Sequence, residues 1–122
     1  MRFENAGIEG LSIELSRLTD IMREAGFILA GQWDYQRVTY DRKFEVKGEI
    51  YYLRVQGFAI EGEIEENARH TVVKLLTPLL GKYYYPHGVE YGDGETFPNS
   101  LVDQSSKLLS QVKENIEAVI NA

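Results

Sequence analysis

The residue types best suited to catalysis are His87 and Glu90, which lie three positions apart in a tyrosine-rich segment. They could bind a metal ion if His70 came near across a sheet, or could act as a general base and its orienting carboxylate. Both signals are weak, because the segment is irregular and the serines lie outside any nucleophile-elbow sequence. We favour His87 as a turn residue after Pro86. A hydrolytic or metal-assisted enzyme centred on His87 and Glu90 is the alternative hypothesis, and we predict no catalytic residue, metal site or cofactor.

A second group of residues is better suited to binding a small apolar ligand. Ser105 falls in the middle of the apolar stripe of the last helical segment, where a small side chain leaves room and offers a hydroxyl. Ligand pockets are mostly apolar with a few polar groups. The opposite wall would come from the strands, through Trp33, Tyr40, Arg42 and Tyr51. In the alternative interpretation, Ser105 only allows close packing, and the Arg42 stem packs on the sheet while its guanidinium reaches solvent.

A third group indicates association with a protein partner. Lys43, Tyr52, Arg54 and Phe58 share the polar face of a predicted hairpin. Aromatic residues and arginine are enriched at interfaces, and Phe58 on a polar face is typical of a dimer patch. We therefore predict a homodimer through this face, with ordinary exposure of single apolar residues as the alternative.

The positions of most of these residues depend on a hairpin that we predict over residues 37–61. Apolar and polar residues alternate on both sides of Lys47-Gly48, which predicts two strands joined by a two-residue loop. In that register the numbers of facing residues sum to 95, so that Phe44 faces Tyr51 and Asp41 faces Arg54. Apolar residues then meet on one face and opposite charges on the other. A longer loop is the alternative, because Lys-Gly is a weaker turn signal than Asn-Gly.

Periodicity elsewhere predicts the remaining elements. Helical spacing of apolar residues indicates helices over 16–25, ending at Gly26, and over 100–122, beginning at a polar cap near Ser100. Strand patterns indicate strands at 11–15, at 27–33 with Phe27, Leu29 and Trp33 on one face, and at 71–76, ending near Pro78. An edge strand or packed loop follows. We expect an α+β fold with two helices on one face of a curved antiparallel sheet.

Composition limits the functional classes. A chain of 122 residues is the size of one domain, here residues 1–122, and the absence of cysteine excludes disulfides and thiolate chemistry. The net charge of −6 and the lack of a basic stripe argue against nucleic acid as a partner. No apolar stretch is long enough to span a bilayer, so we expect a cytoplasmic protein without a membrane partner.

Three segments, Gly31–Tyr35, Arg37–Asp41 and Tyr84–Tyr91, with the opening residues 3–11, resemble the YugN-like family of small proteins from bacilli. The resemblance covers essentially the whole chain. It implies a TATA-binding-protein-like fold and carries over no catalytic residue, because no activity is established for the family. Our hypothesis is a non-catalytic binding module for a small apolar ligand or a protein partner, as a homodimer.

Overall fold

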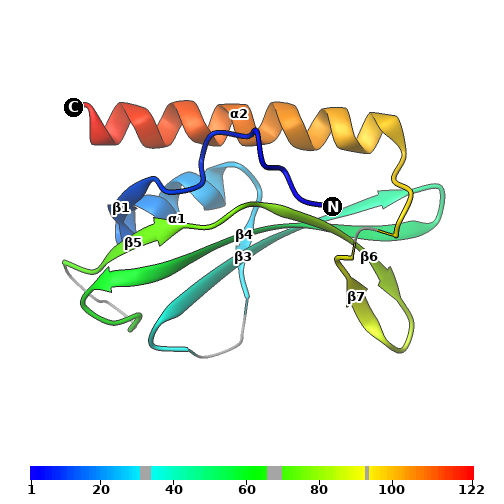
Figure 1. Cartoon of the computed structure of the whole chain (residues 1–122), viewed down its shortest axis with the longest axis horizontal. Coiled ribbons are helices and arrows are strands. Elements are labelled where there is room, and N and C mark those ends of the chain that lie inside the picture. Colours follow the sequence, from blue (N-terminus) through cyan, green and yellow to red (C-terminus); the bar gives the residue numbers. More distant parts are fainter. Residues whose placement is uncertain (31–33, 66–69, 93) are drawn as a thin grey trace.

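The computed structural model describes residues 1–30, 34–65, 70–92 and 94–122. Its strands form a curved seven-stranded antiparallel sheet, and both helices lie on one face of that sheet (Figure 1). The predicted α+β architecture is confirmed. The elements in chain order are β1 (Ser12–Glu14), α1 (Leu15–Glu24), β2 (Ile28–Leu29), β3 (Arg37–Val46), β4 (Glu49–Glu61), β5 (Val72–Leu75), β6 (Leu79–Tyr84), β7 (Gly88–Glu90) and α2 (Asn99–Ile120).

The β3–β4 hairpin has the predicted register. Facing residues sum to 95 from Arg37 and Phe58 at the open end to Val46 and Glu49 at the turn. Lys47 and Gly48 form the two-residue loop with φ of 51° and 80°. Two positive φ values match a type I′ turn, whose twist suits the flanking strands. The core-facing side and the outer side of this hairpin are therefore the ones that the alternation predicts.

Strand β4 organises the sheet, because both of its edges are paired. One edge pairs with β3 along its length, and the other pairs first with β6 at 51–54 and then with β5 at 57–61. Pro78 separates β5 from β6, as the sequence predicts for the end of a strand. The sheet consequently divides into two wings, one carrying β1 and β5 and the other carrying β6 and β7 (Figure 1).

Helix α2 lies across the sheet, above α1 at its C-terminal half (Figure 1). Its buried positions are Leu101, Ser105, Leu109, Val112 and Ile116. The predicted polar cap is wrong: α2 begins directly after Pro98, and no side chain caps it. The carbonyl of Pro98 instead accepts hydrogen bonds from the amides of Leu101 and Val102, at 3.0 and 3.1 Å, so the backbone satisfies the first turn.

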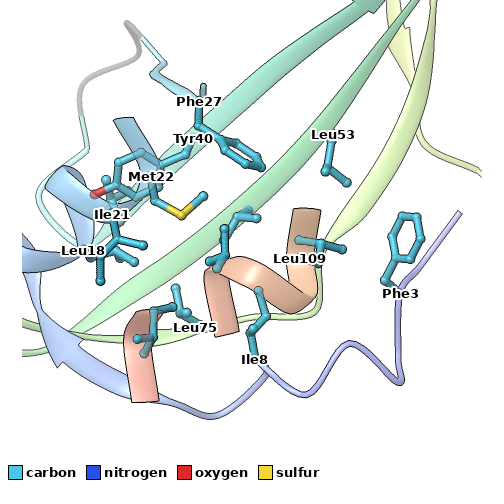
Figure 2. Close-up of a cluster of buried hydrophobic side chains, with 14 of the residues drawn as sticks. Phe3, Ile8, Leu18, Ile21, Met22, Phe27, Tyr40, Leu53, Leu75 and Leu109 are labelled. Carbon is cyan, nitrogen blue, oxygen red and sulfur yellow. The ribbon is translucent and has the colours of Figure 1, made fainter. Parts of the chain in front are cut away.

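The core lies between the two helices and the sheet, and the N-terminal segment closes it on one side. Figure 2 shows Phe3 and Ile8 of this segment beside Leu109 of α2 and Leu53 of β4. Backbone hydrogen bonds fasten the segment along the edge of β6, including one of 2.9 Å from the Phe3 amide to the Pro78 carbonyl. The first residues therefore act as an extra edge of the sheet.

Among the described residues 27–30 of the strand predicted at 27–33, the structure contains the short strand β2. Only Ile28 and Leu29 form β2, and they pair with Asp41 and Tyr40. Leu29 pairs with the core-facing Tyr40 and so points to the same side as Phe27, as predicted, but Phe27 is buried whereas Leu29 is 57% exposed. Leu29 lies on the edge strand, where little of the helical layer covers it. Trp33, the third residue of that prediction, lies outside the described residues.

Candidate functional site

His87 and Glu90 do not form a catalytic centre with His70. His87 is exposed in the turn between β6 and β7, where its amide donates a hydrogen bond of 2.6 Å to the Tyr84 carbonyl. Glu90 is exposed on β7 opposite Lys82. His70 precedes β5, in the other wing of the sheet (Figure 1). Within the described ranges, no group of three histidine, aspartate or glutamate residues is close enough to hold a metal ion.

The residues predicted to line a ligand pocket are mostly buried in the core. Tyr40 is buried with its hydroxyl 2.8 Å from Thr19 Oγ1, and burial raises the pKa of Tyr40 to about 12. Tyr51 is buried at the other end of the hairpin, with its ring 5.9 Å from that of Phe97. Because Tyr51 faces Phe44, four residues along β3 from Tyr40, the two tyrosines are about 13 Å apart along the sheet. They do not meet around one cavity.

Ser105 faces the core as the sequence predicts. It is fully buried on α2, and its hydroxyl oxygen has no hydrogen-bond partner among the residues that the structure describes. A buried hydroxyl without a hydrogen-bond partner lowers the stability of the folded protein. Ser105 therefore either serves close packing through its small side chain or forms its hydrogen bond with a bound ligand. Trp33, another of the four predicted wall residues, lies outside the described residues.

Arg42 occupies a different position from the other predicted pocket residues. Its side chain starts on the core-facing side of β3, but its guanidinium reaches the end of α1, where Nη1 donates a hydrogen bond of 2.6 Å to the Ala25 carbonyl. The guanidinium also lies 5.1 Å from the ring centroid of Phe44. A surface pocket of about 430 Å³ opens here, lined by Glu24, Ala25, Gly26, Arg42, Leu108, Gln111 and Asn115.

Two further pockets of about 460 and 410 Å³ lie between the N-terminal segment and α2. Their walls share Met1, Arg2, Glu4 and Val102. Lys113 lines the second pocket and is 3.7 Å from Glu117, so its charge is already partly balanced within α2. None of the three pockets is lined by Tyr40, Tyr51 or Ser105.

The predicted interface residues share the sheet face opposite the helices. Arg54 donates two hydrogen bonds to Asp41, the facing residue on β3, and these bonds raise the pKa of Arg54. Lys43 is exposed, whereas Tyr52 and Phe58 are half-buried. We call this surface the outer face and define it by the outward side chains of β3 and β4, which are Arg37, Thr39, Asp41, Lys43, Glu45, Ile50, Tyr52, Arg54, Gln56 and Phe58.

Tyr91 joins the outer face, which sequence reasoning did not anticipate. Its ring packs on Gly81, where a Cβ atom would be 2.6 Å away, and the Arg54 guanidinium lies 4.9 Å from its centroid. The pKa of Tyr91 is raised to about 12, mainly because the phenol is buried. The charge of Arg54 lowers this pKa, whereas Asp41 and Tyr52 raise it further. Gly81 inside a strand was the available signal, because such a glycine often marks a close approach.

The chain is similar in sequence to several known proteins. Residues 4–116 match the model of the YugN-like family. The chain is 47% identical over 119 residues to YlbA of Bacillus subtilis (strain 168), across 98% of each chain. It is 27% identical over 103 residues to YugN of the same organism, across 84% of this chain and 75% of that one. Both relatives are described as uncharacterised.

A solved structure has the same fold. The crystal structure of the conserved protein YugN from Geobacillus kaustophilus HTA426 superposes with a TM-score of 0.86 and 55% sequence identity. The match covers 100% of this chain and 99% of the other.

Proposed function

The chain belongs to the YugN-like family, and we propose that it is a non-catalytic binding module that forms a homodimer through its outer face. The observation that supports this proposal is the placement of both helices on the opposite face of the sheet (Figure 1). Within the described ranges no helix covers the outer face. An antiparallel sheet can leave one face to water, but that face is then expected to be polar throughout.

The outer face is not polar throughout. Ile50, Tyr52 and Phe58 are half-buried there. Ile28 of β2 faces the same side, because it pairs with Asp41, and it is 70% exposed. Aromatic side chains beside arginine and exposed aliphatic groups are the composition of an interface core.

The size and charge of the outer face suit a second copy of the chain. The long hairpin strands β3 and β4 have 10 and 13 residues, so the outer face extends for about 33 Å along them. Lys43 and Glu45 are exposed two residues apart on β3. A two-fold axis could therefore place Lys43 of one copy against Glu45 of the second copy, and Glu45 of the first against Lys43 of the second.

The test is the solution mass of the wild-type protein and of Phe58→Asp, measured by light scattering after size-exclusion chromatography. We expect the wild type at twice 14.0 kDa and the variant, with a charge in the interface, as a folded monomer. Ile120→Asp is the matched control, because it adds the same charge to an exposed aliphatic residue on α2 and should leave the dimer intact. A monomeric wild type, or a dimeric Phe58→Asp, would refute the proposal.

Other hypotheses receive less support. An enzyme centred on His87 and Glu90 would need further groups near them, and both side chains point into solvent in a turn and on an edge strand. A small apolar ligand between α2 and the sheet is supported only by the unpartnered hydroxyl of Ser105. The TATA-binding-protein-like fold and the cytoplasmic location stay predictions, although no described helix is long and apolar enough to span a membrane.

A further inference from the structure

We propose that Arg42, Gln111 and Asn115 form a binding site for a small organic monocarboxylate. The site is the pocket of about 430 Å³ between the end of α1 and the middle of α2. It lies on the helical side of the sheet, so this proposal does not depend on the homodimer through the outer face. Pockets of 300–1,000 Å³ are the usual size for small ligands.

The first argument is the placement of Arg42 on the covered side of the sheet. Its neighbours on that side of β3 are Tyr40 and Phe44, and its partner across the hairpin is Leu53, all of them buried. The guanidinium itself leaves this row, because Arg42 is only half-buried and its head reaches the surface pocket beside Ala25. No carboxylate of the described residues lies within salt-bridge distance of Arg42. In the described part of the chain no carboxylate therefore forms a close ion pair with Arg42, and Glu24 is an acidic residue that shares its pocket.

The second argument is the hydrogen-bonding capacity that remains at the guanidinium. A guanidinium has five N–H donors in a planar fork, and Arg42 uses one of them on the Ala25 carbonyl. The planar fork matches the two oxygens of a carboxylate, and it matches a phosphate in the same way. A bound carboxylate could thus accept hydrogen bonds from the remaining donors of Arg42 and form a close ion pair with it.

The remaining wall of the pocket supplies neutral donors and an apolar surface. Gln111 and Asn115 are four residues apart on α2, so their amides lie on one side of the helix, and both are exposed towards the pocket. Leu108, one turn before, is half-buried and lines the same pocket. The amides can donate to the carboxylate, while Leu108 can contact a short carbon chain.

The charges around the pocket restrict the ligand to one negative charge. Glu24 lines the pocket, and the carbonyls at the end of α1 place partial negative charge there. Arg42 and Glu24 together carry no net charge. Anions of higher charge, such as citrate or phosphate, should therefore bind more weakly than a monocarboxylate with a short aliphatic chain.

The proposal can be tested by NMR titration of the full chain with butyrate, followed through the Arg42 Nε–H, the Gly26 amide and the side-chain amides of Gln111 and Asn115. We expect saturable shifts at these groups, an affinity about tenfold lower for Arg42→Gln because a charge-assisted pair is lost, and a higher affinity for Glu24→Gln. Arg17→Gln, an exposed arginine on α1, is the matched control and should bind butyrate as the wild type does.

Because Arg42→Gln also removes the hydrogen bond to Ala25, a second variant keeps the test independent of folding. Gln111→Ala combined with Asn115→Ala changes only exposed positions and should lower the butyrate affinity severalfold. Linear shifts at all butyrate concentrations, or equal affinity in both variants and the wild type, would refute the site. Equal binding of butyrate, citrate and inorganic phosphate would refute the monocarboxylate class.

Discussion

The Nε and Nη2 atoms of Arg54 donate hydrogen bonds to the two carboxylate oxygens of Asp41 at 2.8 and 2.9 Å. The two residues face each other across β3 and β4, and 29% of the Arg54 side chain and 14% of the Asp41 side chain are exposed. A bidentate pair of this geometry contributes more than an ordinary surface ion pair. Since the Arg54 guanidinium also lies over the Tyr91 ring, it connects the central hairpin to the β6–β7 wing.

Arg54→Ala should therefore lower the free energy of unfolding by about 1–2 kcal/mol, because the hydrogen bonds to Asp41 and the contact with Tyr91 are both lost. Chemical denaturation measures the change, and a double-mutant cycle with Asp41→Ala isolates the pair. Lys113→Ala, which removes an exposed pair with Glu117, is the control and should change stability by less than about 0.5 kcal/mol. Additive effects of Arg54→Ala and Asp41→Ala would contradict the coupling.

Gly81→Ala should destabilise the β6–β7 wing. The added Cβ atom would be 2.6 Å from both Tyr91 and Val89, and overpacking of this kind costs about 1–3 kcal/mol. Gly92→Ala is the control, since nothing lies within 4 Å of its added Cβ atom. Thermal denaturation compares the two variants, and equal midpoints would show that Tyr91 does not pack on Gly81.

The raised pKa of two tyrosines predicts how stability depends on pH. The pKa of Tyr40 and of Tyr91 is about 12 in the folded protein, against 10.0 for a free phenol. Because the unfolded chain loses these protons first, their stabilising effect is fully present below pH 10 and is lost as the pH rises through 12. Each residue then contributes a slope of about −1.4 kcal/mol per pH unit.

Denaturation from pH 9 to 12 and phenolate absorbance measure this effect. Tyr40→Phe and Tyr91→Phe should each reduce the slope, whereas Tyr85→Phe, at an exposed position, should leave it unchanged. An unaltered slope in both Tyr40→Phe and Tyr91→Phe would mean that neither phenol is protected from deprotonation.

Ser105→Ala should leave the free energy of unfolding unchanged or raise it by up to about 1 kcal/mol, because it removes a buried hydroxyl that has no partner in the described part of the chain. Ser105→Leu should lower it by about 1–3 kcal/mol through overpacking. Ser106→Ala, at the exposed neighbour, is the control for helix propensity. A loss above 1 kcal/mol in Ser105→Ala would indicate a bound partner and would support the predicted helix–sheet pocket.

Sequence alone determined the hairpin register and the buried side of α2. Alternation with a period of two and helical spacing are local properties, and a shift of one residue in the hairpin would expose the whole apolar row that contains Phe44 and Tyr51. The pairing of Asp41 with Arg54 followed from that register. These features could be predicted because the residues that define them are close in the chain.

Tertiary structure alone decided where the polar groups act. The Arg42 guanidinium meets the end of α1 and the middle of α2, Tyr91 packs on Gly81, and Phe3 closes the core beside β6. Each contact joins separate segments of the chain, and no periodic pattern of the sequence indicates that they meet. Each contact also depends on how the helices cross the sheet. For the same reason His87 and His70 share a residue type but lie in different wings, which only the folded chain reveals.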